Sequence, residues 1–310
     1  MQPLASILLL VECGDRVHQG LSKALMLARY FHARLDLFLC DTEGYVRTHP
    51  GPMAAGARTR ARCVADGSDY LQALRKSIVA ADVEIATEAV CHRSLREAVT
   101  EKAERCAADL LVKTTEASCL DAANRSATDW AAMAECPPPL LLTRGRSWRP
   151  IPQFAAVLQV ALESNRAATR AVADLTVALA LACSAEVDML WTGLDRPYEC
   201  GEAARHAIQF KDSPAAVRRP LFVEGAAHDV IPAALEEGDY DLVVLEKPRL
   251  TGAAAARSLV GSVLAMCGGD VVLTDTTAPG SGYASRVNTV DEHRAFEATH
   301  VFAVRPRHED

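Results

Sequence analysis

The feature that most constrains the fold of this 310-residue chain is a series of short apolar segments that alternate with amphipathic segments of helical length. The series occurs twice, once in each half of the chain. In the first half the apolar segments cover 7–12, 35–40, 83–91, 109–113 and 139–143; in the second they cover 155–162, 187–191, 220–224, 241–245 and 270–274. Continuous apolar stretches of this length predict buried strands, and their alternation with helices predicts βαβ units. The chain is therefore predicted to contain one α/β unit twice.

Two short sequences make the duplication concrete, because Ala108–Lys113 and Tyr240–Leu245 both place an aspartate before a run of leucine and valine. The offset between the halves falls from about 150 residues at the first strand to 132 at the fourth, so the second copy is predicted to be shorter between strands two and three. The predicted organisation is a first domain over 1–147, a linker over 148–154, a second domain over 155–278 and a tail over 279–310. The apolar run at 299–304 predicts an added edge strand in that tail.

Composition excludes several classes of protein. Lysine and arginine are outnumbered 33 to 40 by aspartate and glutamate, which argues against a nucleic-acid partner. Apolar runs such as 7–11 are far too short for a membrane span, and nothing around this run is typical of a signal peptide. Ten cysteines without a CxxC pair predict free thiols in a reducing cytoplasm, and the missing HxxxH and CxxC spacings predict no metal site.

Further motifs follow the fourth strand of each half. The first half has Thr128-Asp129-Trp130 and then Cys136-Pro137 before a short strand, and the second has Leu250-Thr251-Gly252 before a small-residue helix that ends near Cys267. In this order the features resemble a tandem universal stress protein, most closely the E-type members of that family. The resemblance covers nearly the whole chain and implies two doubly wound five-stranded parallel sheets, with strand order 3-2-1-4-5, forming a pseudo-dimer.

Both the resemblance and the general rule for open parallel sheets locate a ligand crevice beyond the ends of strands one and four. Many single-domain members of the family bind ATP there, with an acid ending strand one and a loop of the form GxxG, nine residues, then GS or GT after strand four. Glycine lets backbone N–H groups approach phosphates. The first half keeps an acid at Glu12 but reads Lys113-Thr114-Thr115-Glu116 after strand four, with no glycine before Gly145. Lys113 either pairs with an anionic ligand or extends to solvent.

The second half departs from the same pattern in another way. Ala161 stands at the expected acidic position, with Glu163 two residues on, and the loop reads Glu246-Lys247-Pro248-Arg249-Leu250-Thr251-Gly252. Glutamate and arginine replace the two glycines, and proline removes one N–H donor. A tight ATP site is therefore not expected in the first half and stays open in the second.

The register of the second loop leaves two alternatives. Counting forward from Gly252 makes Gly261-Ser262 the expected phosphate-binding pair, whereas counting back from strand five puts Arg257-Ser258 at the loop-to-helix junction and Gly261-Ser262 inside the helix. In the first half, Thr128 or Asp129 either caps a helix or forms a ligand platform with Trp130, and capping is favoured. Lys247 and Arg257 together are candidates to hold a phosphate by charge.

No GxSxG elbow, GxGxxG loop or SGGxDS-like motif occurs, so a catalytic function is not predicted. The predicted function is a non-catalytic cytoplasmic stress-response protein with degenerate nucleotide pockets, acting through ligand sensing or protein partners as a monomeric pseudo-dimer or a homodimer. The alternatives are a carrier of an apolar or acyl ligand and a weak ATP-binding protein that uses domain 2. The candidate ligand-binding residues are Glu12, Lys113, Thr114, Thr128, Asp129, Glu246, Lys247, Gly252, Arg257, Ser258, Gly261 and Ser262.

Overall fold

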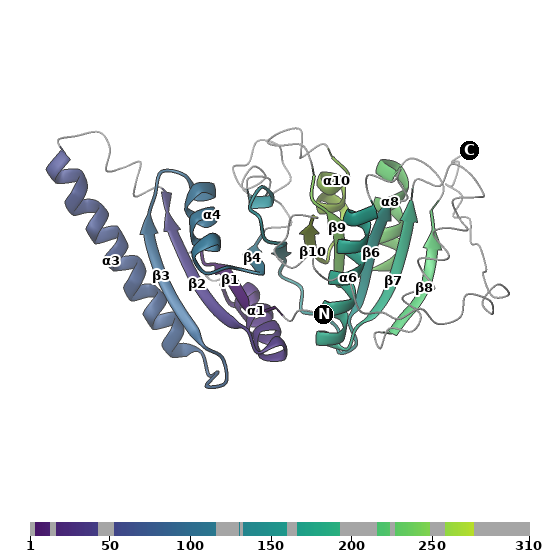
Figure 1. Cartoon of the computed structure of the whole chain (residues 1–310), viewed down its shortest axis with the longest axis horizontal. Coiled ribbons are helices and arrows are strands. Elements are labelled where there is room, and N and C mark those ends of the chain that lie inside the picture. Colours follow the sequence, from purple (N-terminus) through teal and green to yellow (C-terminus); the bar gives the residue numbers. More distant parts are fainter. Residues whose placement is uncertain are drawn as a thin grey trace. The chain divides into compact units, whose positions relative to one another are not determined.

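The computed structural model describes residues 4–12, 17–42, 53–115, 130, 133–159, 166–192, 216–223, 227–248 and 258–275. The chain divides after Gly145 into two compact units, a first unit up to that residue and a second unit from Arg146 onward. In each unit the strands lie side by side and helices pack against them (Figure 1).

The first unit is a parallel sheet with strand order β3-β2-β1-β4-β5 in the described residues. Its elements are β1 (Ser6–Leu10), α1 (Val17–Phe31), β2 (Arg34–Asp41), α3 (Met53–Ser77), β3 (Ile85–Cys91), α4 (Leu95–Arg105), β4 (Leu110–Thr114) and β5 (Leu140–Thr143). The reversal of strand order between β1 and β4 is the switch point of a doubly wound sheet.

The second unit repeats this arrangement with strand order β8-β7-β6-β9-β10, again parallel throughout. Its elements are β6 (Gln153–Gln159), α6 (Arg166–Cys183), β7 (Glu186–Thr192), β8 (Ala216–Phe222), α8 (Ala227–Gly238), β9 (Leu242–Glu246), α10 (Leu259–Met266) and β10 (Asp270–Thr274). The predicted fold class, two tandem doubly wound sheets of order 3-2-1-4-5, is confirmed.

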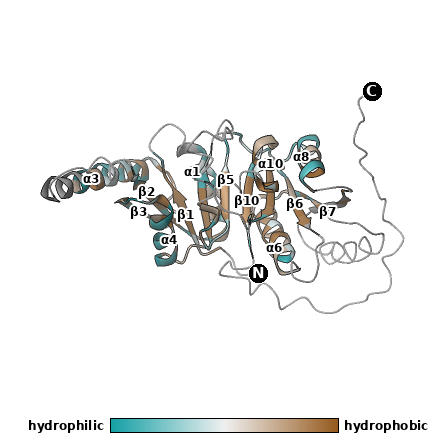
Figure 2. Cartoon of the chain, turned by 90° about the horizontal axis from the view of Figure 1, so that it is seen from above, coloured by the Kyte–Doolittle hydropathy of each residue, from teal (hydrophilic) through white to brown (hydrophobic). Residues whose placement is uncertain are grey.

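The strands form the apolar core of each unit, as Figure 2 shows by their hydropathy. Every residue of β1 and β5 is buried, which fits strands covered on both faces. In the first unit Leu39 of β2 faces α3, whereas Asp36 of the same strand contacts α4. Because side chains alternate along a strand, α3 and α4 cover opposite faces.

An aspartate before the fourth strand of each unit performs the same structural task. Asp109 Oδ2 accepts hydrogen bonds from the backbone N–H groups of Ala5 and Ser6 at 2.7 and 3.0 Å. Asp241 Oδ2 accepts one from the N–H of Gln153 at 2.9 Å. Each carboxylate thus satisfies backbone donors at the start of the central strand. This shared task explains why an aspartate stands before the fourth strand in both halves.

The helix-to-strand turns are also duplicated. The residues after α1, α4, α6 and α8 have left-handed backbone with φ of 54°, 46°, 52° and 45°, and they are His32, Ala107, Ser184 and Asp239. After three of these helices, the next N–H donates to a carbonyl of the last helical turn at 2.8–2.9 Å. Glycine normally occupies this position, since other residues pay a steric cost there. The backbone form is shared between the units although its side chains differ.

Several predicted boundaries need correction. Strand β8 starts and ends earlier than the predicted strand over 220–224, and β6 likewise precedes the predicted 155–162. Helix α3 was not predicted, because its mixture of alanine, arginine and glycine gives only a weak apolar stripe. The predicted linker over 148–154 overlaps the first residues of β6. The predicted edge strand over 299–304 lies outside the described residues, and the remaining domain limits stay predictions.

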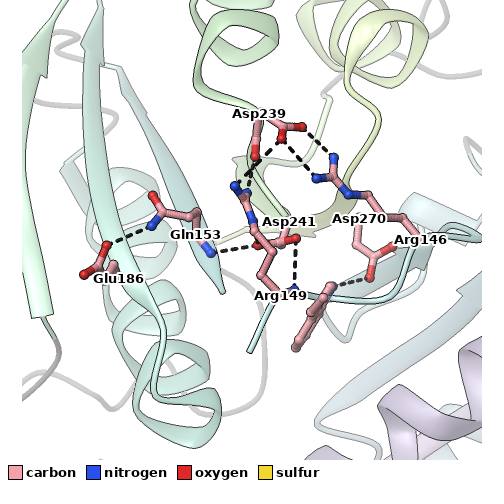
Figure 3. Close-up of polar contacts among 8 residues, drawn as sticks. Arg146, Arg149, Gln153, Glu186, Asp239, Asp241 and Asp270 are labelled. Carbon is pink, nitrogen blue, oxygen red and sulfur yellow. Dashed lines mark hydrogen bonds and ion pairs between the residues drawn. The ribbon is translucent and has the colours of Figure 1, made fainter. Parts of the chain in front are cut away.

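Residues 146–153 are held to the amino ends of β9 and β10 by a polar network within the second unit (Figure 3). Its side-chain contacts are Arg146–Asp239 at 2.5 Å, Arg149–Asp241 at 2.8 Å and Trp148–Asp270 at 2.8 Å. This edge lies opposite the carboxyl ends of the strands, where a ligand is expected. The network therefore anchors the start of the second unit and leaves its ligand edge untouched.

Candidate functional site

The candidate site of the first unit lies at its switch point, beyond the carboxyl ends of β1 and β4. The parallel register places Leu10 beside Lys113, so Glu12 follows just past the end of β1. Two residues that are 101 positions apart in the sequence are thereby brought to one place. The sequence predicted both of them as ligand-binding candidates, and the structure joins them to each other.

Glu12 and Lys113 form an ion pair between Oε1 and Nζ. The lysine side chain is only 2% exposed, whereas the glutamate side chain is 58% exposed. A buried ammonium needs a counter-charge, because transferring it from water without one is costly. Lys113 therefore does not extend to solvent, and its charge is balanced by Glu12. Its pairing with an anionic ligand stays a prediction.

Two threonine hydroxyls meet a glycine of α1 at the ends of β4 and β5. Thr143 Oγ1 lies 3.2 Å from Thr114 Oγ1 and 3.4 Å from the carbonyl oxygen of Lys113. A Cβ atom at Gly20 of α1 would lie 2.6 Å from Thr114 Oγ1, so a side chain at this position would force that hydroxyl to move. The ends of β4 and β5 are consequently closed by a helix that approaches them closely.

Sequence reasoning missed Gly20 and two neighbours on α1. Lys23 is buried and its Nζ donates to the carbonyl oxygen of Arg144 at 3.3 Å, while Gln19 Nε2 donates to that of Gly145 at 3.4 Å. A glycine inside an otherwise amphipathic helix is the signal that would have found this contact, because it weakens the helix unless close packing requires it.

The equivalent positions in the second unit carry different chemistry. Pairing along the strands makes Leu245 the counterpart of Lys113, and Glu246 the counterpart of Thr114. The counterpart of Glu12 is Gln159, because β6 pairs with β9 as β1 pairs with β4. The prediction that Ala161 occupies the acidic position was therefore wrong by two residues, since β6 begins earlier than its apolar pattern indicated.

Lys247 is a buried cation of the second unit, and it lies one residue beyond β9. Its N–H donates to the carbonyl oxygen of Thr274 at 2.8 Å, and its Nζ lies 3.7 Å from Asp275 Oδ2. Glu246 is half-buried at the end of β9. Both units thus bury a lysine close to the end of their fourth strand and place a carboxylate near it, although the two lysines do not occupy equivalent positions.

The structure distinguishes the two registers considered for the loop before α10. Ser258 is the N-cap residue, its Oγ accepting from the N–H of Gly261 at 3.5 Å, and Gly261 and Ser262 lie within the helix. This is the register obtained by counting back from strand five. Gly252 and Arg257 lie outside the described residues, so their part in ligand binding stays a prediction.

Trp130 is 4% exposed, with its indole N–H buried and without a hydrogen-bond partner. The neighbouring candidates Thr128 and Asp129 lie outside the described residues. Within the parts of the chain that the structure describes, no group of three or more histidine, cysteine or carboxylate residues is arranged to hold a metal ion. No helix of those parts combines the length and apolar character that a membrane span requires.

Fold and site together define a tandem doubly wound α/β protein with a polar cluster at a switch point. No protein-family model and no curated protein matches the sequence. A universal stress protein from Archaeoglobus fulgidus DSM 4304 has a similar structure, with a TM-score of 0.61 and 10% identity over 87% of this chain and 96% of its own. The chain therefore has the fold of the universal stress proteins, as its sequence motifs predicted.

Two further solved structures show how widely this fold is used. A functionally unknown protein from Pseudomonas aeruginosa PAO1 is similar over 89% of this chain and 94% of its own, with a TM-score of 0.62 and 19% identity. The cytoplasmic domain of a prokaryotic cation chloride cotransporter covers 90% of this chain and 98% of its own, with a TM-score of 0.52 and 9% identity. The fold alone consequently does not determine function, which has to be argued from the site.

Proposed function

We propose that this protein is a non-catalytic, cytoplasmic stress-response protein whose nucleotide pockets have degenerated, and that it acts by sensing a small anionic ligand or by binding a partner. The fold supports the stress-response assignment. The ion pair between Glu12 and Lys113 is the observation that carries the proposal for the pockets.

The ion pair opposes nucleotide binding in the first unit for an electrostatic reason. The carboxylate that would accept hydrogen bonds from a nucleoside is engaged by the protein's own lysine, and the lysine charge is already neutralised. An incoming phosphate has to displace Glu12 before it gains the ammonium, so part of its binding free energy is spent on breaking a pair. The exposed position of Glu12 allows this exchange, which is what ligand sensing requires.

The second unit supports weak binding for a different reason. Lys247 is buried near Asp275, and the serine hydroxyl at the start of α10 accepts from its own helix. At the end of β9 and just beyond it, glutamate and arginine also replace two expected glycines. Fewer backbone N–H groups are then free to approach a phosphate.

Isothermal titration with ATP and with inorganic phosphate tests this proposal. The wild-type protein is expected to bind both weakly, with Kd values of about 1 mM or above. Glu12→Gln removes the competing carboxylate and is expected to tighten phosphate binding about tenfold, because an anion then meets an uncompensated ammonium. Lys113→Met is expected to lose any phosphate binding of the first unit.

Glu246→Gln is the matched control, since this glutamate ends the equivalent strand of the second unit and has no part in the Glu12–Lys113 pair. It should leave phosphate affinity within about twofold of wild type. Micromolar ATP binding by the wild-type protein would contradict the proposed degeneration of the pockets, and its survival in Lys113→Met would assign it to the second unit. ATP turnover of about 1 per second or faster would contradict the non-catalytic assignment.

A further inference from the structure

Helix α3 packs one stripe of residues against β2 and β3. Leu71 and Leu74 are buried on this stripe, and Gly67 marks its closest approach to the sheet. A Cβ atom at Gly67 would lie 3.1 Å from the Cβ of Ala89 and 3.3 Å from Leu39 Cδ2. The backbone of α3 is therefore unusually near the strands at this point.

The direction of packing is set by two contacts. Gly67 lies over Ala89, and further along the helix Gln72 Nε2 donates to Thr87 Oγ1 at 3.0 Å. From the first contact to the second, the position advances from 67 to 72 along α3 but goes back from 89 to 87 along β3. Helix and strand therefore run antiparallel. Moving one helical turn back from Gly67 leads to Cys63, and moving two residues forward from Ala89 leads to Cys91.

Both steps cover nearly the same distance in the same direction. One turn of helix spans about 5.4 Å, and two strand residues span about 6.6 Å. Residues two apart on a strand share a face, so Cys91 faces α3 as Ala89 does. Cys63 precedes Gly67 by four residues, which is the spacing of the sheet-facing stripe. Two thiols from separate elements are thus brought together.

The chemical surroundings agree with this juxtaposition. Both cysteines carry thiols that form no disulfide in the structure, and both are half-buried. Burial raises the pKa of the Cys91 thiol, and the charge of Cys63 and Asp41 raises it further while Arg60 lowers it. An electrostatic effect of Cys63 on Cys91 requires that the two side chains lie close. A disulfide needs Cβ atoms about 3.5–4.5 Å apart. One turn along α3, a Cβ atom at Gly67 would lie 3.1 Å from that of Ala89, so helix and strand approach closely in this region.

We propose that Cys63 and Cys91 form an oxidation site for small hydroperoxides, at which a disulfide joins α3 to β3. A thiolate sulfur attacks a peroxide oxygen and becomes a sulfenic acid, and the displaced hydroxide or alkoxide takes up a proton. The second thiol then attacks this sulfur, forming the S–S bond and releasing water. Two thiols are oxidised by two electrons and one hydroperoxide is reduced, so hydrogen peroxide yields two water molecules.

Peptide mapping of the full-length protein tests the site. After treatment with a small excess of hydrogen peroxide and alkylation of the remaining thiols, trypsin releases the peptides 63–75 and 77–93, each with one cysteine. Mass spectrometry is expected to find these two peptides joined by a disulfide and to find them separate after reduction. Thermal unfolding of the oxidised protein should occur roughly 5 °C higher, because the cross-link restricts the unfolded chain.

Cys40→Ser supplies the matched control. Cys40 precedes Asp41, the register partner of Cys91, so it points to the opposite face of the sheet. Burial also raises the pKa of its thiol to about 12. The joined peptides should persist in Cys40→Ser and disappear in Cys63→Ser and Cys91→Ser. Oxidised wild-type protein with separate 63–75 and 77–93 peptides, or with either thiol joined to another cysteine, would overturn the proposal.

Discussion

The two units bury an aspartate at the same position of their second strand but stabilise it differently. Asp36 and Asp188 occupy equivalent positions in the strand register. The carboxylate of Asp36 forms salt bridges with Lys102 Nζ at 2.7 Å and with Arg34 Nε at 2.9 Å. The carboxylate of Asp188 instead accepts a hydrogen bond from the Tyr240 hydroxyl at 3.0 Å. Both units thus keep a buried aspartate at this position, whereas the side chains that bind its carboxylate differ between them.

The ligand edges differ in the same manner. A salt bridge between Glu12 and Lys113 occupies the first switch point, and Gln159 and Leu245 stand at those positions in the second. At the amino edge, the network of Arg146 and Arg149 belongs to the second unit. The charge pairs at the two edges of the sheet therefore differ between the units.

The largest difference between the units is expected at the buried aspartates. Lys102→Met leaves the carboxylate of Asp36, which is 1% exposed, without its buried cation, and should destabilise the first unit by about 3 kcal/mol. Tyr240→Phe removes one hydroxyl donor and should cost the second unit about 1–2 kcal/mol. Urea unfolding measures the loss, and hydrogen exchange with mass spectrometry assigns it to a unit.

Arg105→Met is the control for Lys102→Met, because Arg105 is exposed on the same helix and pairs with Glu88 of β3. An exposed pair of this kind should contribute less than about 1 kcal/mol. Equal losses in Lys102→Met and Tyr240→Phe would show that the nature of the partner does not matter. The contrast drawn between the two units would then be wrong.

A smaller effect, with the opposite sign, is expected at the left-handed helix ends. Ala107→Gly should stabilise the first unit by about 0.5–1 kcal/mol, because glycine adopts the observed φ of 46° without steric cost. Asp239→Gly should gain less or destabilise, since it also removes the ion pairs with Arg146 and Arg149. The midpoints of chemical unfolding give both values, and destabilisation by Ala107→Gly would contradict the expectation.

The smallest effect concerns acid stability. Hydrogen bonding to Arg146, assisted by the charges of Arg146 and Arg149, lowers the pKa of Asp239 below its usual value of 3.8. The stabilisation is therefore fully present above the unfolded-state pKa and is lost as pH falls through the folded-state pKa, in the range below about pH 4. Asp239→Asn should flatten this part of the pH profile of unfolding. Its counterpart in the first unit is Ala107, where no carboxylate titrates.

Much of the architecture could be predicted because it depends on local patterns. Continuous apolar segments such as Leu8–Val11 and Asp241–Leu245 identify buried strands, and their order with intervening helices defines a doubly wound sheet. Helix α3 escaped prediction since its stripe of Cys63, Gly67, Leu71 and Leu74 contains few large apolar residues. Strand β8 was misplaced because its first residues include two arginines, which no apolar pattern reveals.

The sequence by itself determined that the chain repeats one parallel α/β unit and that Glu12 and Lys113 stand where its crevice should be. Only the tertiary structure decided that these two residues neutralise each other, that Gly20 permits α1 to close over Thr114, and that Gln159 stands opposite Glu12 in the duplication. The physical reason is that strand identity follows from local periodicity, whereas these contacts depend on register and helix placement between residues far apart in the chain.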